Sequence, residues 1–256
     1  MTDSIELAAQ YLAGARRRGG HALRLPENCR PTDEAAALAV QTRVAEILGE
    51  TVGGWKCSLP NAKGIVLAPI LGSNIYASVA GPSGSPCPVR PRGEWARIEP
   101  EIGFVLGRDL PPRAVPYSPE EAHDAVAETR LLVELLGNRY AEPDTIPYLE
   151  MLADCLSNQG LVVGPTISQP PPARCTIRLT VGSEPPRIID GRHPDGGPFG
   201  TFLWAANYLA AGNRGMRAGQ VVTTGSFAGA LEEPLNVPVD VEFERLGAIA
   251  VQFRAV

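Results

Sequence analysis

The sequence predicts an α+β fold, and three observations lead to this prediction. Segments with strand spacing outnumber segments with helical spacing along the 256 residues. Strands and helices do not alternate regularly, as a doubly wound parallel sheet requires. A hydrophobic content of 44%, with 20% charged residues, is enough for a substantial buried core. We expect one structural unit, with a helical layer at residues 1–60 packed on a strand-rich domain at residues 61–256.

Composition excludes several classes of function. The net charge of −5 leaves no basic surface for nucleic acid and no polybasic patch for a membrane. No apolar segment is long enough for a transmembrane helix, and the N-terminal residues lack the apolar stretch of a signal peptide. The cysteines are odd in number and never in CxxC spacing: Cys29, Cys57, Cys87, Cys155 and Cys175. This usage is typical of reduced thiols, so we expect a cytoplasmic protein.

The N-terminal layer is predicted to contain two helices. Residues 3–18 have an amphipathic pattern that ends in Arg16-Arg17-Arg18 and a glycine pair, which suits a helix C-terminus. We interpret the three arginines as a solvated helix end and not as a phosphate site. The second helix follows Pro31-Thr32 and ends at Gly49.

The remaining elements follow from turn and capping signals. Residues 81–93 are rich in Gly, Pro and Ser, which predicts a loop. Ser118-Pro119-Glu120-Glu121 is typical of a helix start, and we expect that helix to run to about Arg130. A further helix is predicted at residues 199–211. Strands are expected at residues 175–181, 237–243 and 248–253.

The stretch from Ala96 to Leu106 is the centre of the prediction. Strand geometry places Arg97, Glu99 and Glu101 on one face and apolar side chains on the other. Pro100, between the two glutamates, indicates an edge strand or a bulge. The Cβ atoms of the two glutamates lie about 7 Å apart on such a strand, and the two like charges repel each other unless a positive group lies between them.

A third carboxylate strengthens this interpretation. Glu134 lies in the middle of the apolar run 131–136, where an ionised side chain is costly unless it is paired or bound to a metal. Glu99, Glu101 and Glu134 on two apolar strands predict a site for a hard cation, Mg²⁺ or Mn²⁺. The residues alone equally allow a solvated edge carrying Glu99 and Glu101, with Glu134 paired to an arginine such as Arg97.

Other polar residues are candidates for a site. Lys56 follows Gly53-Gly54-Trp55, where it can bind a carboxylate or transfer a proton, although a surface lysine at a strand start is the simpler interpretation. Ser157 stands beside Asn158 and Gln159, where polar groups can line a pocket. Gly225-Ser226 closes an apolar strand, and it offers backbone N–H groups and a hydroxyl to a ligand oxygen.

The histidines and Ser226 do not match the pattern of a known catalytic or zinc site. His123 and His193 are expected at the surface, since neither has a partner at the spacing of a nucleophilic triad or a zinc site. Ser226 is not expected to act as a hydrolase nucleophile, because no GxSxG elbow surrounds it.

An ordered set of segments resembles the 2-keto-4-pentenoate hydratase and 4-oxalocrotonate decarboxylase branch of the fumarylacetoacetate hydrolase superfamily. The resemblance extends from about residue 30 to the C-terminal residues. Single segments are unspecific, but their order and spacing together are specific. They are Gly54-Trp55-Lys56, the run Ala96–Glu101, Val133-Glu134, Ala153-Asp154 with Ser157, the run Arg217–Ser226, and the run Phe243–Gly247.

This resemblance implies a mixed β-roll or β-sandwich core with N-terminal helices, usually in a homo-oligomer. It implies that Glu99, Glu101 and Glu134 hold Mg²⁺ or Mn²⁺, which a 2-oxo acid chelates through a carboxylate oxygen and its 2-oxo group. Lys56 corresponds to the active-site lysine of the family. Ser157 and Ser226, with Gly225, correspond to contacts for the substrate carboxylate.

The expected reaction is hydration of a 2-hydroxy-2,4-dienoate to a 4-hydroxy-2-oxo acid, in the breakdown of aromatic compounds. One departure is Ile70, which stands where the hydratases typically have an acidic residue, and the loss of an acid–base group costs about 10²–10⁴-fold in rate if the group is essential. Cys155-Leu156, where the family usually has Asn-Ala, is a second departure.

Three alternatives remain open. The first is decarboxylation of 2-oxo-3-hexenedioate, for which the second carboxylate of the substrate needs another cation, with Arg139 as a candidate. The second is an acylpyruvase-type C–C hydrolase, which needs a water-activating His–Glu pair. His21 and Glu27 are the nearest candidates for that pair, but their spacing and setting do not match. The third is a non-catalytic homologue that keeps the metal scaffold.

Overall fold

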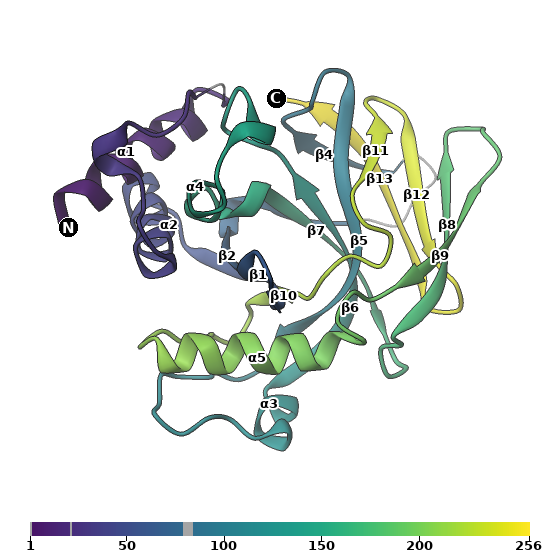
Figure 1. The fold of residues 1–256 in the computed structure, drawn as a ribbon. Helices are drawn as coiled ribbons and strands as arrows, with labels where there is room; N and C mark the ends of the chain where they lie inside the picture. The colour runs from purple at the N-terminus through teal and green to yellow at the C-terminus, as the bar shows by residue number, and fades with distance from the viewer. Residues whose placement is uncertain (1, 21, 79–83) are drawn as a thin grey trace.

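The computed structural model describes residues 2–20, 22–78 and 84–256, and its architecture is α+β with two curled mixed sheets, as predicted (Figure 1). Helices α1 and α2 lie at one side of the molecule, and the second sheet lies at the other (Figure 1). The helices are α1 (Thr2–Arg17), α2 (Glu34–Leu48), α3 (Pro119–Asp124), α4 (Tyr148–Ala153) and α5 (Pro198–Ala211).

The larger sheet carries the candidate site. Its strands are ordered β2-β1-β10-β5-β6-β7-β3, and β11 also pairs with β5. Pairing is antiparallel except for β1 with β10 and β3 with β7, which are parallel. The strands are β1 (Val52–Asn61), β2 (Gly64–Leu71), β3 (Ile75–Ala77), β5 (Trp95–Leu106), β6 (Val126–Leu136), β7 (Asn158–Ile167), β10 (Val221–Thr223) and β11 (Leu231–Pro234).

The smaller sheet covers one face of the larger sheet. Its strand order is β4-β13-β12-β8-β9, with β4 (Ser85–Val89), β8 (Arg174–Val181), β9 (Arg187–Arg192), β12 (Pro238–Phe243) and β13 (Gly247–Ala255). Alternate residues of both sheets form the main core between them, including Ile98, Val133, Val241 and Phe253. The period-two pattern of the sequence therefore records a buried face on each strand.

Helices cover the other parts of the larger sheet. Helices α1, α2 and α4 share one apolar cluster, and α5 packs on β1 and β5. Phe202 of α5 and Phe104 of β5 have ring centroids 5.3 Å apart. These helices leave the opposite face of β1 and β5 free to carry polar groups.

Two predicted elements differ from the structure. The capping box of Ser118 and Glu121 is present, but helix α3 ends at Asp124 and not near Arg130, because the following residues pair with β5 as strand β6. The predicted loop at 81–93 contains strand β4, which pairs with β13. Pro86 and Pro88 are tolerated there because β4 is an edge strand of its sheet.

All five cysteines are free thiols, as their spacing predicted. Within the described ranges, no helix is both long and apolar enough to cross a membrane. The division between residues 1–60 and 61–256 stays a prediction, and β1, which begins before that boundary, lies inside the larger sheet.

Candidate metal centre

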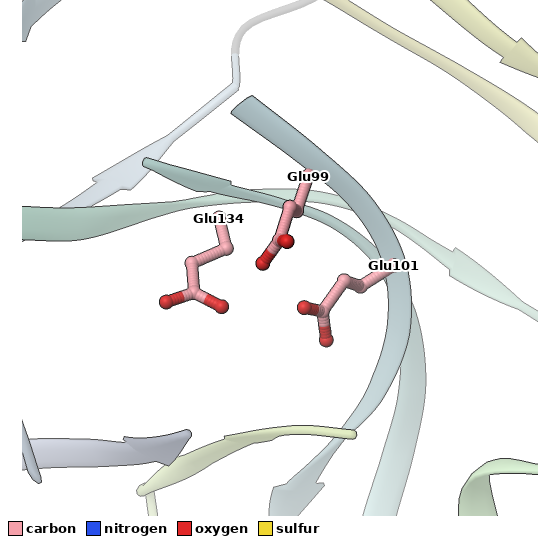
Figure 2. A group of neighbouring side chains, drawn as sticks. All are labelled: Glu99, Glu101 and Glu134. Atoms are coloured by element: carbon pink, nitrogen blue, oxygen red, sulfur yellow. The ribbon is translucent and has the colours of Figure 1, made fainter. Parts of the chain in front are cut away.

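The register between β5 and β6 brings the three predicted glutamates together. Glu99 lies directly opposite Glu134, and Glu101 lies one same-face position further along β5, opposite Leu132. The three side chains point into one space from these two strands (Figure 2). The predicted alternation is confirmed, because Ala96, Ile98, Ile102, Phe104 and Leu106 are buried on the other face.

The three carboxylates form a compact and largely buried group. One oxygen from each lies within 4.8 Å of the others, and the side chains of Glu101 and Glu134 are 1% and 0% exposed. Burial raises the pKa of Glu101 well above its usual value, and repulsion from Glu134 and Glu99 raises it further. Burial also raises the pKa of Glu99. Like charges held opposite each other on neighbouring strands destabilise a sheet, so this arrangement needs a compensating cation.

Glu101 is fixed by backbone donors at the end of β10. The N–H groups of Thr224 and Gly225 both donate to its Oε2, each at 2.8 Å. Gly225 has a φ of +119°, and an added Cβ would lie 2.8 Å from Pro194. Only glycine meets both conditions without strain, which explains the Thr-Gly-Ser sequence at this point.

Pro100 lies at a break in the ladder on one side of β5. Strand β11 pairs with residues 95–98 and strand β10 with residues 104–105, so no strand covers Pro100 on that side. Its carbonyl accepts a hydrogen bond from Phe227 N at 2.9 Å. The proline therefore marks an interrupted edge, in agreement with the sequence interpretation.

Lys56 is a member of the site and not a surface lysine. Trp55 and Cys57 point into the core under α5, which places Lys56 on the opposite face, with its side chain 12% exposed. Its Nζ lies 3.0 Å from Glu134 Oε1 and 3.8 Å from Glu99 Oε2. Burial acts to lower the pKa of Lys56, but Glu134 and Glu99 outweigh it and raise the pKa above its usual value.

Gly54 allows this lysine to lie next to β10. A Cβ at Gly54 would be 2.3 Å from the carbonyl oxygen of Val221, so a side chain there would separate the two parallel strands. Glu134 thus pairs with Lys56, and the alternative that it pairs with Arg97 is wrong. Arg97 instead lies 3.9 Å from Glu232.

Two buried oxygen atoms of the site have no protein partner. Asn158 Nδ2 donates to Glu134 Oε1 at 2.8 Å, but Glu134 Oε2 has no hydrogen-bond partner among the described residues. The same holds for Oγ1 of Thr223, which pairs in register with Lys56 and therefore shares its face. An unsatisfied buried polar group costs about 1–3 kcal/mol. Oxygen donors in this arrangement fit a hard divalent cation, whose opposing ligands lie about 4–5 Å apart.

The turn that carries Ser157 has a strained backbone, and side chains from other elements contact it. Cys155, Leu156 and Ser157 have φ values of 60°, 49° and 67°, a conformation that costs non-glycine residues about 1 kcal/mol or more each. Leu156 O accepts from Lys56 Nζ at 3.4 Å, and Ser157 Oγ donates to Asn138 Oδ1 at 2.8 Å. The strained turn therefore lies beside the carboxylates.

Arg139 supports this turn and does not face the site as a free cation. Its side chain is buried, with Nε 2.8 Å from both oxygens of Asp154 and Nη1 2.8 Å from Asn158 O. The guanidinium is thus fully engaged with the protein. The candidate role of Arg139 as a contact for a second substrate carboxylate has no support in this geometry.

Gly225 and Ser226 lie next to the glutamates, in a loop that is held by its own hydrogen bonds. Ser226 Oγ lies 3.0 Å from Gly229 O and 3.3 Å from Pro100 O, and it accepts a hydrogen bond from Ala228 N at 3.2 Å. These contacts hold the loop that positions Glu101. The substrate contacts of Ser157, Gly225 and Ser226 stay predictions.

Ile70 forms part of the apolar wall on the same face of the sheet. It is fully buried in a small cluster with Leu132, Leu161 and Val221. Leu161 lies opposite Glu134, and Leu132 lies opposite Glu101. An isoleucine thus closes the wall at the position where the resemblance predicts an acid.

Sequence reasoning expected Asn158 beside a pocket but not its contact with Glu134, it missed Thr223, and it misplaced His193. His193 is 2% exposed and not a surface residue, because the turn before α5 folds it against the Thr224 loop. Its Nδ1 accepts hydrogen bonds from the N–H groups of Asp195 and Gly197, and its Nε2 lies 3.4 Å from Thr224 Oγ1. These are tertiary contacts, which the spacing of residues along the sequence does not predict.

His123 and Glu27 lie away from the site on exposed segments. His123 is exposed, as predicted. Glu27 is exposed at the start of a short 3₁₀ helix, and His21 lies outside the described residues.

Comparisons with known proteins agree with this fold. The chain is 26% identical to 2-keto-4-pentenoate hydratase 1 of Dechloromonas aromatica (strain RCB), over 98% of this chain and 97% of the relative. It is 25% identical to a 4-oxalocrotonate decarboxylase of Pseudomonas sp, over 60% of this chain and 59% of that protein. The structure of 4-oxalocrotonate decarboxylase from Pseudomonas putida G7, complexed with magnesium and adipate, has the same fold, with a TM-score of 0.79, 16% identity, and coverage of 99% and 98% of the two chains.

A family model settles the relationship. The model of the fumarylacetoacetate (FAA) hydrolase C-terminal domain matches residues 50–254, a range that contains all three glutamates and Lys56. The chain therefore belongs to the fumarylacetoacetate hydrolase family.

Proposed function

We propose that this protein is a metal-dependent lyase that hydrates a 2-hydroxy-2,4-dienoate to a 4-hydroxy-2-oxo acid. One observation carries the proposal: three converging glutamates lie within reach of a buried lysine, and one of them has a buried oxygen with no partner in the described part of the chain. The relative that matches over nearly its full length is named a 2-keto-4-pentenoate hydratase, which supports this reaction.

Glu99, Glu101 and Glu134 would hold Mg²⁺ or Mn²⁺. When bound, such a cation polarises the 2-oxo group of the substrate and stabilises the enolate that forms next to it. Structural neighbours in complex with magnesium and with calcium support a hard cation at this fold.

The other residues of the site would transfer the proton, bind the substrate carboxylate and exclude water. Lys56 Nζ, charged and held at 3.0 Å from Glu134, is placed to hold or transfer the proton at the carbon next to the 2-oxo group. The hydroxyl of Thr223, which has no partner among the described residues, would donate to the substrate carboxylate, together with the loop of Gly225 and Ser226. Ser157 would join them by releasing its hydrogen bond to Asn138. The apolar wall around Ile70 excludes water from the carbon chain.

Glu134→Gln tests the metal assignment. The variant keeps the size of the side chain and removes one charge, so Mn²⁺ or Mg²⁺ affinity measured by calorimetry should fall by about 100-fold or more. Glu128→Gln is the matched control, because Glu128 lies on the same strand but pairs with the half-buried Arg130 outside the glutamate cluster. Equal affinities in both variants would contradict the assignment.

The reaction is tested by ultraviolet spectroscopy with 2-hydroxypenta-2,4-dienoate and Mg²⁺. Loss of the diene absorbance with formation of a 4-hydroxy-2-oxo acid is expected. If neither this compound nor 2-oxo-3-hexenedioate is converted, the chain is a non-catalytic homologue and the proposal fails.

A specific observation favours decarboxylation of a 2-oxo diacid as the second candidate. Arg97 and Leu136 form the rung next to Glu99 and Glu134 on the same face, and both line a cavity of about 500 Å³. A guanidinium at that distance can bind a carboxylate at the far end of a six-carbon chain. The absence of an acid at position 70 also favours this reaction over hydration.

Arg97→Gln separates the two reactions. With 2-oxo-3-hexenedioate the variant should lose CO₂ release, whereas conversion of the monoacid should not change. Arg92→Gln is the control, since Arg92 lines the same cavity but pairs with Asp144 at 3.1 Å. The homo-oligomer implied by the family remains to be measured by light scattering.

A further inference from the structure

Three arginine side chains gather around a single aspartate at the end of helix α1. Arg139 takes both oxygens of Asp154 at 2.8 Å, and Arg16 reaches only one of them, at 3.4 Å. Arg90 donates through Nη2 to the backbone oxygen of Arg16 at 2.5 Å. Across residues 2–20, 22–78 and 84–256, Arg90 has no carboxylate at ion-pair distance. The cluster therefore holds an excess of positive charge.

Arg16 is not the solvated helix end that the sequence predicts. Its side chain is only 10% exposed, and its Nε is buried with no hydrogen-bond partner among the described residues. Burial lowers the pKa of Arg90, and the neighbouring Arg16 lowers it further. A buried guanidinium with an unused donor is costly unless an anion completes its surroundings.

A cavity of about 310 Å³ is lined by Arg16, Arg17, Arg90 and Arg139, and we name it the arginine pocket. Among the described side chains that line it, only Glu50 carries a carboxylate, which accepts a hydrogen bond from Ser73 Oγ at 2.7 Å. Val256, the last residue of the sequence, also lines the cavity. None of the metal-centre glutamates lines it, and neither does Lys56. The arginine pocket is thus separate from the site described above.

We propose that the arginine pocket binds a small oxyanion with one or two negative charges, either phosphate or a small carboxylate. The planar fork of a guanidinium, such as that of Arg16 or Arg90, matches pairs of oxygen atoms on such an anion. The competing interpretation is that Arg16 is simply a structural partner of Asp154, and the two make opposite predictions for the removal of Arg16. This proposal does not depend on the proposed lyase activity.

The test uses four full-length proteins without substrate: wild type, Arg16→Gln, Arg90→Gln and Arg18→Gln. Arg18 is the matched control, because it ends the same arginine run but is exposed and does not line the cavity. Melting temperature is measured in inorganic phosphate, in succinate and in NaCl of equal ionic strength. At about ten times its Kd, a bound anion should raise Tm by about 3 °C or more in the wild type and in Arg18→Gln.

Arg16→Gln and Arg90→Gln should lose this anion-dependent rise. Arg16→Gln should also be at least as stable as the wild type in low salt, because it relieves repulsion within the cluster. A saturable response to phosphate alone, or to succinate alone, identifies which oxyanion binds. An equal response in all four proteins, no response in the wild type, or a marked loss of stability in Arg16→Gln would overturn the proposal.

Discussion

At the scale of single residues, Lys56 has two roles that one substitution can separate. Its ammonium group lies 3.0 Å from Glu134 Oε1, and it is also the group that we propose for proton transfer. Lys56→Met should reduce kcat by about 10²–10⁴-fold, because proton transfer by a positioned group contributes this much. Mn²⁺ affinity should stay equal or increase, because the ammonium no longer competes for Glu134.

Steady-state kinetics and calorimetry check this prediction. The chain has only one other lysine, Lys63, which is exposed, so Lys63→Met is the matched control with the same change of charge. If Lys56→Met bound Mn²⁺ much more weakly than Lys63→Met, the lysine would belong to the metal site itself and not to the proton transfer.

Asn158 was expected to line a pocket, but its contact with Glu134 could not be predicted from the sequence. Its amide donates to Glu134 Oε1 because a register shift between β6 and β7 turns it toward the carboxylates. Alternation predicted Glu99 and Glu101 correctly, since both lie on one strand. Asn158, Thr223 and His193 depend on how distant strands align, and a local pattern contains no information on that alignment.

At the scale of elements, the turn Cys155–Ser157 depends on the ion pair beneath it. Arg139→Met leaves Asp154 buried with only the distant contact to Arg16, so we expect a loss of about 3 kcal/mol in the free energy of unfolding. Urea denaturation measures this loss. Arg174→Met, which removes an exposed arginine of a surface pair, should change stability by less than about 1 kcal/mol.

Helix α3 provides a pH-dependent element. A hydrogen bond from Arg113 lowers the pKa of Glu121 to about 2, and the backbone N–H of Ser118 contributes to the shift. The stabilisation is therefore complete above the usual pKa of glutamate, about 4.5, and is lost as the pH falls toward 2. Glu121→Gln should show a smaller decrease in stability than the wild type across this interval.

The difference between the two proteins is read from urea denaturation at several pH values. The variant keeps a side chain that suits the capping box, so loss of the helix does not obscure the titration. Parallel pH profiles for the two proteins would contradict the assignment of this effect to Glu121.

Element boundaries were predictable where the signal was local. The capping box of α3 and the extent of α5 follow from their own residues. The end of α3 and the existence of β4 do not, because β6 and β4 form by pairing with strands elsewhere in the chain. Prolines that break most strands are compatible with the edge position of β4.

At the scale of the whole molecule, we predict how reactive the five thiols are. Burial raises the pKa of Cys87 to about 12 and that of Cys175 to about 11, so neither is a reactive thiolate at neutral pH. Cys175 is the one cysteine that is not fully buried. Alkylation at pH 8, followed by mass spectrometry, should modify Cys175 first and the other four only on unfolding. A reductant should leave Tm unchanged.

The parallel pairing of β1 with β10 joins residues 54–56 to residues 221–223, close to opposite ends of the chain. Closing so long a loop is entropically expensive, and contacts of this kind slow folding. The lysine and the loop that fixes Glu101 therefore meet only after almost the entire polypeptide has been organised. The three glutamates themselves come from the neighbouring strands β5 and β6, so a partly folded chain can bring them together while Lys56 and the backbone donors for Glu101 are still missing.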